Sequence, residues 1–544
     1  MVEGRNQKQE KKLRLPDNVL PIKYILTFEP NSTYSEFNAE LDLVVQIKSD
    51  SDVMEINLHK DHYSGVINPE LCEGVFSVVD QKLIPKDTTQ TEEVNQAFRL
   101  ENTQICTQFQ DKFARMLMPC LDEPQFKAIF QVNVLVKEKT HQAISNSACC
   151  IEQLIDGNRL YKFEDTLKMP TYLLAIVIGK FDTLTLTTKR GVQIKTYTQS
   201  GLSEDAREST QLACEAFDYL EEYFQIDYPL QKADIISCNK FSVVGMENWG
   251  CIIFDRYLIL GNQNNTNKDQ LFNNYRTLCH EVCHQWFGNL VTMQWWDDIW
   301  LNEGFSRYME HVMMADLRPE FNVWQEFMDQ MYFASIQLDS FLEITHPVQL
   351  EVKGNEKFYE IFDTISYNKG SSICRMIEGY IGDKNLFREC MRVYMKQYQY
   401  RNASTAELFQ VMSEVSGKPV AKVFHKWIQQ PCFPEILVTK VSEKQYKLRQ
   451  QCFNSQTEDL WIIPVNYVTS KQKIGQFLIE NQDLIVDIPE LEADEMIWFN
   501  YNAFGYYILR YEDQNEFNTI YDQRQIFGGL TVYSIKVNRE MLLQ

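Results

Sequence analysis

The sequence has no apolar run long enough to cross a bilayer. The longest, near residues 172–178, has the length of a buried strand. Residues 1–14 are polar and basic, without the apolar core of a signal peptide. The sequence therefore predicts a cytoplasmic protein with no membrane span.

Positive charge is scarce, and the cysteines show no disulfide rhythm. Lys and Arg number 53 against 75 Asp and Glu, which gives a net charge of -22. Because phosphates repel an acidic surface, nucleic acid is excluded as a partner.

The 14 cysteines are scattered, as expected of free thiols in a reducing compartment. Cys279 and Cys283 are a second candidate pair of metal ligands, but burial as small apolar filler is favoured.

The length and the hydrophobic patterns indicate several domains. A chain of 544 residues typically holds three or four domains, at about 150 residues each. Strand-like alternation dominates residues 15–182, helical periodicity begins at 204–225, and alternation returns from 434 to about 511. The last thirty or so residues have no clear pattern, and no internal repeat is evident. These patterns predict a multidomain α+β fold.

A His-Glu-x-x-His motif carries the strongest chemical signal. His280 and His284 are four residues apart, so on a helix their imidazoles lie on one face. Glu281 follows the first histidine, where a carboxylate can reach a water on the same ion without being a ligand. Glu303 is a candidate third ligand. Three protein ligands and one open position predict a single catalytic Zn2+ ion rather than a closed structural site.

Two helices are expected to carry these ligands. Apolar residues recur at helical intervals over residues 269–289, and Gly288 stands near the end of that stretch. A second helix is expected from about Asp298, so that Glu303 lies on a helix packed against the first. Glu310 falls on the same helical face as Glu303. It either supports a metal ligand from behind or is a surface carboxylate.

Two further stretches of the sequence carry candidate site residues. Residues 244–250 read Val-Gly-Met-Glu-Asn-Trp-Gly, and residues 362–370 read Phe-Asp-Thr-Ile-Ser-Tyr-Asn-Lys-Gly. With the histidine motif, they make the chain resemble the zinc aminopeptidases of the gluzincin type, and among these the puromycin-sensitive and membrane alanyl aminopeptidase group. The resemblance runs from residue 14 to about residue 511.

The resemblance implies a fold and a domain order. Its domains would be a β-rich N-terminal domain, a thermolysin-like zinc catalytic domain, a small β-sandwich, and a remnant of the C-terminal helical domain that this family usually has. In this chain they would span residues 1–186, 187–433, 434–513 and 514–544. The first of them would be partly shortened.

The resemblance also implies a role for each matching residue. His280, His284 and Glu303 match the zinc ligands, and Glu281 matches the general base. Tyr367 matches the tyrosine that stabilises the oxyanion. The implied substrate-binding residues include Glu247, which would bind the free α-amine of a peptide, and they are Gly245, Met246, Glu247, Asn248 and Gln108. Peptides with a free N-terminus are the expected partners, and oligomeric state is not indicated.

Departures from the family pattern keep other hypotheses open. Val244 and Cys432 stand where glycine is usual, and a β-branched residue at 244 is expected to crowd a bound peptide. Residues 59–107 form a shorter segment than usual, without the expected glycine-tyrosine-serine stretch. These features suit a non-catalytic or weakly active peptide-binding relative, a shortened gene product. The third hypothesis is a zinc endopeptidase, which would share the metal site but would not need Glu247 to bind a free α-amine.

Overall fold

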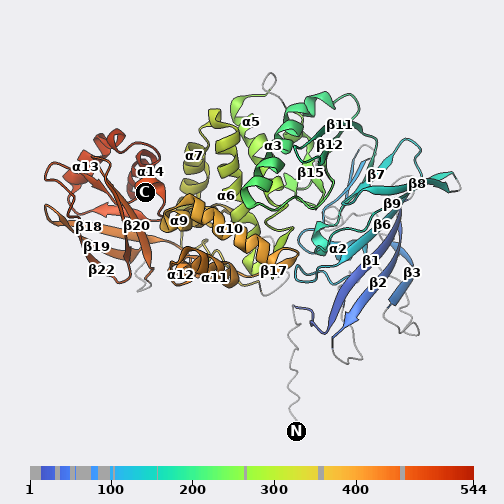
Figure 1. Cartoon of the computed structure of the whole chain (residues 1–544), viewed down its shortest axis with the longest axis horizontal. Helices are drawn as coiled ribbons and strands as arrows, with labels where there is room; N and C mark the ends of the chain where they lie inside the picture. Colours follow the sequence, from blue (N-terminus) through green and yellow to red (C-terminus); the bar gives the residue numbers. More distant parts are fainter. Residues whose placement is uncertain are drawn as a thin grey trace, which may run out of the picture.

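The computed structural model describes residues 14–30, 37–48, 56, 75–83, 98–101, 104–155, 157–239, 241–261, 266–352, 361–453 and 460–543. These residues form an elongated molecule with strands at both ends and helices in the middle (Figure 1). The predicted multidomain α+β class is confirmed. The shortened segment, 59–107, lies largely outside the described residues, and the domain boundaries at 186, 433 and 513 stay predictions.

The N-terminal end is built from two sheets. In the larger sheet, of order β3-β2-β1-β6-β9-β8, β1 pairs in parallel with β6 and the other neighbours are antiparallel. Tyr24, Leu26 and Phe28 alternate along β1 and are fully buried, as period-two burial requires. The strands of the two sheets are β1 (Val19–Pro30), β2 (Phe37–Ile47), β3 (Val75–Leu83), β6 (Ile129–Val136), β8 (Cys149–Ile155) and β9 (Asn158–Phe163), then β4 (Phe98–Glu101), β5 (Gln104–Thr107), β7 (Gln142–Ser145) and β10 (Ile176–Gly179).

The strand expected at residues 172–178 is only partly correct. A 3-10 turn, η1 (Thr171–Leu173), follows Pro170, and the strand β10 begins only at Ile176. The buried Asn146 amide donates to the Leu173 carbonyl at 2.7 Å, and its oxygen accepts from Ala175 N–H at 2.8 Å. This side chain therefore replaces the backbone partners that a strand would have supplied.

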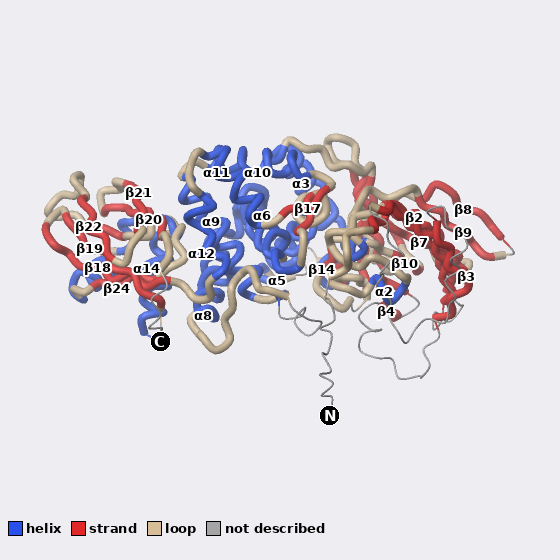
Figure 2. The backbone as a smooth tube through the Cα atoms, turned by 90° about the horizontal axis from the view of Figure 1, so that it is seen from below, coloured by secondary structure: helices blue, strands red, loops and turns tan. Residues whose placement is uncertain are grey.

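The central part combines a five-stranded sheet with a group of helices. The sheet order is β11-β12-β13-β15-β14, which leaves β14 at an edge. Figure 2 shows the helices of this part lying between the two strand-rich ends. The strands are β11 (Asp182–Thr187), β12 (Gln193–Thr198), β13 (Lys232–Cys238), β14 (Gly245–Met246) and β15 (Cys251–Asp255), with β16 (Val291–Met293) and β17 (Arg401–Ala403) as a separate pair. The helices are α3 (Arg207–Phe224), α4 (Arg256–Ile259), α5 (Lys268–Cys283), α6 (Trp300–Leu317), α7 (Val323–Glu326), α8 (Phe333–Asp339), α9 (Gly370–Ile381), α10 (Lys384–Tyr398), α11 (Thr405–Ser416) and α12 (Val420–Gln429), and α2 (Ala114–Leu117) lies in the N-terminal part.

Helix α5 ends earlier than the sequence predicted. The expected helix ran to residue 289, but α5 ends at Cys283 and His284 is its C-terminal cap. Gly288 has φ +113°, and the Asn289 N–H bonds back to the His284 carbonyl at 3.1 Å. The aromatic side chains of this turn still face the core, so the apolar spacing continues through it. Periodicity therefore overestimated the length of the helix.

The C-terminal end is a second strand-rich region with two helices. Its strands form a four-stranded sheet, β22-β19-β18-β24, and a three-stranded sheet, β21-β20-β23. The Asn538 side chain accepts from the Leu509 N–H at 2.6 Å and donates to its carbonyl at 2.7 Å, which fixes α14 to β24. The elements are β18 (Pro434–Ser442), β19 (Gln445–Cys452), β20 (Ile463–Thr469), β21 (Ile474–Ile479), β22 (Asp483–Asp487), β23 (Ile497–Trp498), β24 (Ile508–Tyr511), α13 (Gln514–Asp522) and α14 (Thr531–Leu543). Over the described ranges, no helix has the length and apolar character needed to span a membrane.

Candidate active site

The three predicted metal ligands come together between α5 and α6. His280 and His284 point their Nε2 atoms at each other, 3.0 Å apart. The Glu303 carboxylate lies 3.3 Å from the first Nε2 and 3.2 Å from the second. Tetrahedral zinc with bonds of about 2.0–2.1 Å places neighbouring ligand atoms about 3.3 Å apart. The triangle of donor atoms therefore fits a zinc ion, and its residue types are those that zinc takes.

Groups behind the histidines fix the orientation of both rings. His280 Nδ1–H donates to the Glu310 carboxylate at 2.6 Å, and His284 Nδ1–H donates to the Phe287 carbonyl at 2.9 Å. The Ser306 hydroxyl also lies 3.0 Å from His284 Nδ1. With the proton held on Nδ1, each Nε2 keeps its lone pair for a metal ion.

Glu310 is the centre of a buried charge network. Its side chain is fully buried, so the surface-carboxylate interpretation is wrong. Arg276 and Arg307 each donate to its Oε1 at 2.9 Å, while its Oε2 accepts from His280. Neither arginine was expected at the site. Their spacing was a usable signal, because Arg276 lies four residues before His280 and Arg307 three before Glu310.

The site concentrates buried carboxylates around the two histidines. Burial raises the pKa of Glu281 to about 8, and burial also raises the pKa of Glu247. Burial acts to lower the pKa of His284, but the Glu303 carboxylate outweighs it and raises that pKa to about 10. Burial likewise opposes ionisation of Glu303, yet the two histidines hold its pKa well below the usual range. A divalent cation would relieve this excess of carboxylates.

Glu281 lies against the edge strand β14. A Cβ atom added at Gly245 would overlap the Glu281 carboxylate, so only glycine allows this approach. Val244 is 58% exposed, and its carbonyl accepts from Asp255 N–H at 3.2 Å, which anchors the strand to β15. The expected crowding of a bound peptide by Val244 stays a prediction. Met246, by contrast, is buried beneath the sheet edge.

The other predicted peptide-binding residues present buried polar atoms without protein partners. Gln285 and Asn289 donate to the Glu247 carbonyl at 3.0 and 2.8 Å and so fix the backbone there. Over the described residues, the Glu247 Oε1, both polar side-chain atoms of Asn248 and the Gln108 Oε1 have no hydrogen-bond partner. Buried polar groups are normally paired, so these atoms are suited to receive a polar ligand. Within the same ranges, no hydrogen bond joins Gln108 to the other predicted site residues.

Tyr367 lies in a π-helical segment, η7 (Ile365–Lys369), directly before α9. Its ring stacks on the His280 imidazole with centroids 6.0 Å apart, and the Arg307 guanidinium lies 5.3 Å from its centre. Burial raises the pKa of Tyr367, so its hydroxyl keeps a proton to donate. Lys369, at the end of η7, forms a fully buried ion pair with Asp339 at 2.8 Å, which holds the segment in place.

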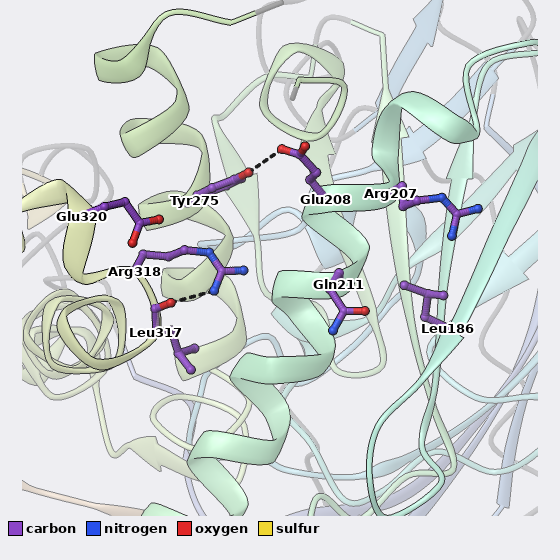
Figure 3. Close-up of a pocket in the computed structure, with 8 residues that line it drawn as sticks. All are labelled: Leu186, Arg207, Glu208, Gln211, Tyr275, Leu317, Arg318 and Glu320. Atoms are coloured by element: carbon purple, nitrogen blue, oxygen red, sulfur yellow. Dashed lines mark hydrogen bonds between the residues drawn. The ribbon is translucent and has the colours of Figure 1, made fainter. Parts of the chain in front are cut away.

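A separate pocket of about 520 Å³ contains none of the predicted site residues. It lies between the start of α3, the middle of α5 and the end of α6 (Figure 3). Tyr275 donates to Glu208 across it at 2.8 Å, and Arg318 donates to the Leu317 carbonyl at 2.7 Å. These polar groups use one another as partners, which distinguishes the pocket from the site around Glu247.

The fold and the site together define a gluzincin: two histidines on one helix, a glutamate on the next, and a carboxylate beside them. The Peptidase family M1 domain matches residues 208–427, and the Peptidase M1 N-terminal domain matches residues 95–173. The chain belongs to peptidase family M1, and the predicted resemblance is confirmed.

Three relatives illustrate the similarity. The chain is 32% identical to the leucyl aminopeptidase of Saccharolobus solfataricus, over 90% of this chain and 60% of the relative. It is 30% identical to the puromycin-sensitive aminopeptidase of Caenorhabditis elegans, over 92% and 57%. Aminopeptidase M1 of Arabidopsis thaliana is 33% identical, over 75% and 48%. The chain thus spans about half the length of the curated relatives it matches.

Proposed function

We propose that the chain is a zinc aminopeptidase that releases N-terminal residues from peptides. One observation carries the proposal: the buried Glu247 and Glu281 carboxylates lie with His284 in a single cluster that adjoins the His280, His284 and Glu303 triangle. A metal centre, a base and an anchor for a cation are thus within reach of one substrate.

The proposed chemistry begins with the metal and the base. His280, His284 and Glu303 would hold one zinc ion, which when bound lowers the pKa of a coordinated water to about 7 and polarises the scissile carbonyl. The Glu281 carboxylate accepts the proton of the attacking water. It holds that proton and then delivers it to the leaving amine.

Tyr367 is proposed to stabilise the charge that develops on the carbonyl oxygen. Its ring is fixed between His280 and Arg307, and its hydroxyl remains protonated. A preorganised donor in a site shielded from water lowers the energy of the transition state more than that of the substrate.

Glu247 is proposed to make the enzyme an exopeptidase. Its unpartnered, buried carboxylate oxygen would pair with the α-ammonium group of the substrate. An internal peptide bond offers no such cation, so its binding leaves a buried charge unpaired. The free edge of β14 at Gly245 and Met246 would pair with the peptide backbone, and Asn248 and Gln108 would line the site.

The decisive experiment uses a panel of aminoacyl-coumarin substrates with the zinc-loaded chain. We expect release that a chelator abolishes and that Glu281→Gln reduces by at least about a hundredfold, because the general base is lost. The matched control is Glu320→Gln, an exposed carboxylate, which should keep full activity. Unchanged hydrolysis in Glu281→Gln would overturn the mechanism, and a folded, zinc-loaded protein without turnover would favour a peptide-binding function.

The cytoplasm stays the proposed compartment, and short peptides with a free N-terminus stay the proposed substrates. Cell fractionation tests the first. The substrate panel tests the second and ranks the N-terminal side chains.

A further inference from the structure

A second cavity lies where the central helices meet the C-terminal end of the chain. Its volume is about 350 Å³, and it is lined by parts of α3, α6, α7, α9 and α10 and by residues near Asn502 and Gly529. This volume is at the lower end of the range for small-molecule sites. None of the predicted catalytic or metal-binding residues lines it.

Arg375, on α9, is a buried cation with an incomplete set of partners. Its side chain is 4% exposed, and its guanidinium is stacked against Trp324 at 4.6 Å and Phe504 at 4.8 Å. One amino group donates to the Asn502 carbonyl at 2.7 Å, but the Nε–H has no partner among the residues that the structure describes. Over the described residues, no carboxylate forms an ion pair with it. Burial lowers its pKa to about 9, which leaves it charged at neutral pH.

Arg388, on α10, contributes a second cation to the same cavity. Its guanidinium lies 4.6 Å from the Tyr223 ring, and its buried Nε–H also lacks a partner in the described part of the chain. In the pocket that Figure 3 draws, by contrast, Arg318 forms an ion pair with Glu215 at 2.8 Å. A buried arginine normally has such a partner.

The carboxylates that line the cavity do not supply this partner. Asp316 accepts from the Tyr219 hydroxyl at 2.7 Å, and Glu378 accepts from the Tyr308 hydroxyl. Burial raises the pKa of Glu378 to about 7, so at neutral pH this group is about half protonated. The cavity therefore keeps a surplus of positive charge, to which Lys384 at its edge adds.

We propose that this cavity binds a small organic anion, in which a carboxylate or phosphate group is carried on an apolar body. The anionic group would accept from the Nε–H groups of Arg375 and Arg388, since a guanidinium group donates strong, charge-assisted hydrogen bonds to both carboxylates and phosphates. The apolar body would contact the remaining lining, to which Val312, Phe387 and Leu530 contribute. The proposal is independent of the proposed peptidase activity.

The test is calorimetric titration of the full chain with benzoate and, separately, with inorganic phosphate at constant ionic strength. We expect saturable binding of at least one probe, with benzoate the tighter if the apolar lining takes part. Arg375→Lys, which keeps the charge but removes the planar fork, and Arg388→Gln should each weaken it about tenfold or more. Arg318→Gln, in the pocket of Figure 3, is the matched control and should bind as the wild type does.

Circular dichroism of each variant separates lost binding from lost folding. Because Arg388 is only partly buried, its variant is the one expected to fold without change. Failure of both probes to bind below about 10 mM would overturn the proposal. Equal affinity in the wild type and a folded Arg388→Gln variant would also overturn it.

Discussion

Glu310 sets both the geometry and the charge around one proposed metal ligand. It accepts from His280 on one oxygen and from two arginines on the other. The arginines keep the carboxylate ionised despite its burial, because they hold the pKa of Glu310 well below its usual range. An ionised partner at Nδ1 makes Nε2 a stronger donor to a metal ion.

We therefore predict that Glu310→Gln weakens zinc binding. A neutral amide still fits beside His280 but loses the charge, and changes at such supporting groups typically cost about 10- to 100-fold in metal affinity. Competition with a chromophoric chelator measures the effect. Glu320→Gln is the control, and an unchanged zinc affinity in Glu310→Gln would contradict the prediction.

At the residue scale, the sequence predicted what spacing can encode. His280, His284 and Glu303 were identified from their separation along helices, and the structure brings their ligand atoms together. Arg276 and Arg307 were missed because a charged residue on a helix is usually solvated, and their burial follows only from how α5 and α6 pack.

At the scale of elements, two glycines set the distance between α6 and η7–α9. Gly304 follows the ligand Glu303, and Gly370 follows the segment that holds Tyr367. Their backbones touch, because a Cβ at 304 would lie 3.1 Å from the Gly370 backbone. This contact is not visible in the sequence. There, both glycines lie within stretches of helical periodicity, and glycine lowers the helix propensity of such a stretch.

Gly304→Ala is predicted to separate these two elements. The added methyl must displace backbone rather than a flexible side chain, so we expect a loss of about 1–3 kcal/mol in stability. The displacement would also move Tyr367 relative to Glu303, so kcat should fall more than KM rises. Thermal unfolding and steady-state kinetics measure the two effects. Gly417→Ala is the control. Its added Cβ would meet open space, but the φ at this position is +68°, so we expect lower stability with an unchanged kcat. Equal kcat in Gly304→Ala and the wild type would contradict the prediction.

Glu378 on α9 gives a pH-dependent contribution to stability. Tyr308, Tyr223 and Lys384 face it from neighbouring helices, and burial raises its pKa from an ordinary 4.5 to about 7. Between these values the unfolded chain loses this proton and the folded chain keeps it, so stability falls as pH rises from about 4.5 to 7. Glu378→Gln should therefore be more stable than the wild type at pH 8, by about 2–3 kcal/mol, with little gain at pH 4.5.

Urea unfolding at pH 4.5 and pH 8 tests this prediction, with Glu320→Gln as the exposed control. A gain in Glu378→Gln that is the same at both pH values would show that Glu378 is ionised in the folded protein throughout.

The element boundaries show where periodicity fails as a guide. Local signals set both ends of α11, since Ser404 and Glu407 form a capping box at its start and Gly417 follows its last turn with a positive φ. The predicted end of α5 was wrong, because contacts with distant residues fix the turn after Cys283. One of them is the hydrogen bond that the Tyr172 hydroxyl donates to the Gly288 carbonyl. Local chemistry was readable from the sequence, and tertiary contacts were not.

At the scale of the whole molecule, the proposed metal would join two helices that are otherwise held by packing and by the bonds of Glu310 to Arg276 and His280. A ligand that binds only the folded state stabilises it by RT ln(1 + [L]/Kd), which is about 2.7 kcal/mol at a hundredfold excess over Kd. We predict that zinc raises the melting temperature of the metal-free chain. Glu281→Gln should keep this shift, whereas His284→Ala should lose it, since only the latter removes a ligand atom. A shift that persists in His284→Ala would place the zinc elsewhere.

A second prediction concerns the specificity of the whole site. Peptides with an acetylated N-terminus lack the cation proposed to pair with Glu247, so they should be cleaved at least about a hundredfold more slowly than free ones. Liquid chromatography of matched free and acetylated peptides measures the ratio. Equal rates would favour the endopeptidase reading.

The two sets of proposed functional residues differ in how far apart they lie along the chain. His280 and Glu303 belong to consecutive helices, so closing the loop between them costs little chain entropy. Glu247 and Tyr367 come from two distant segments, whose meeting requires the sheet and the helices to have assembled. During refolding, the capacity to capture a metal ion should therefore arise before the capacity to process a peptide, and a chain halted part-way would hold zinc without turnover.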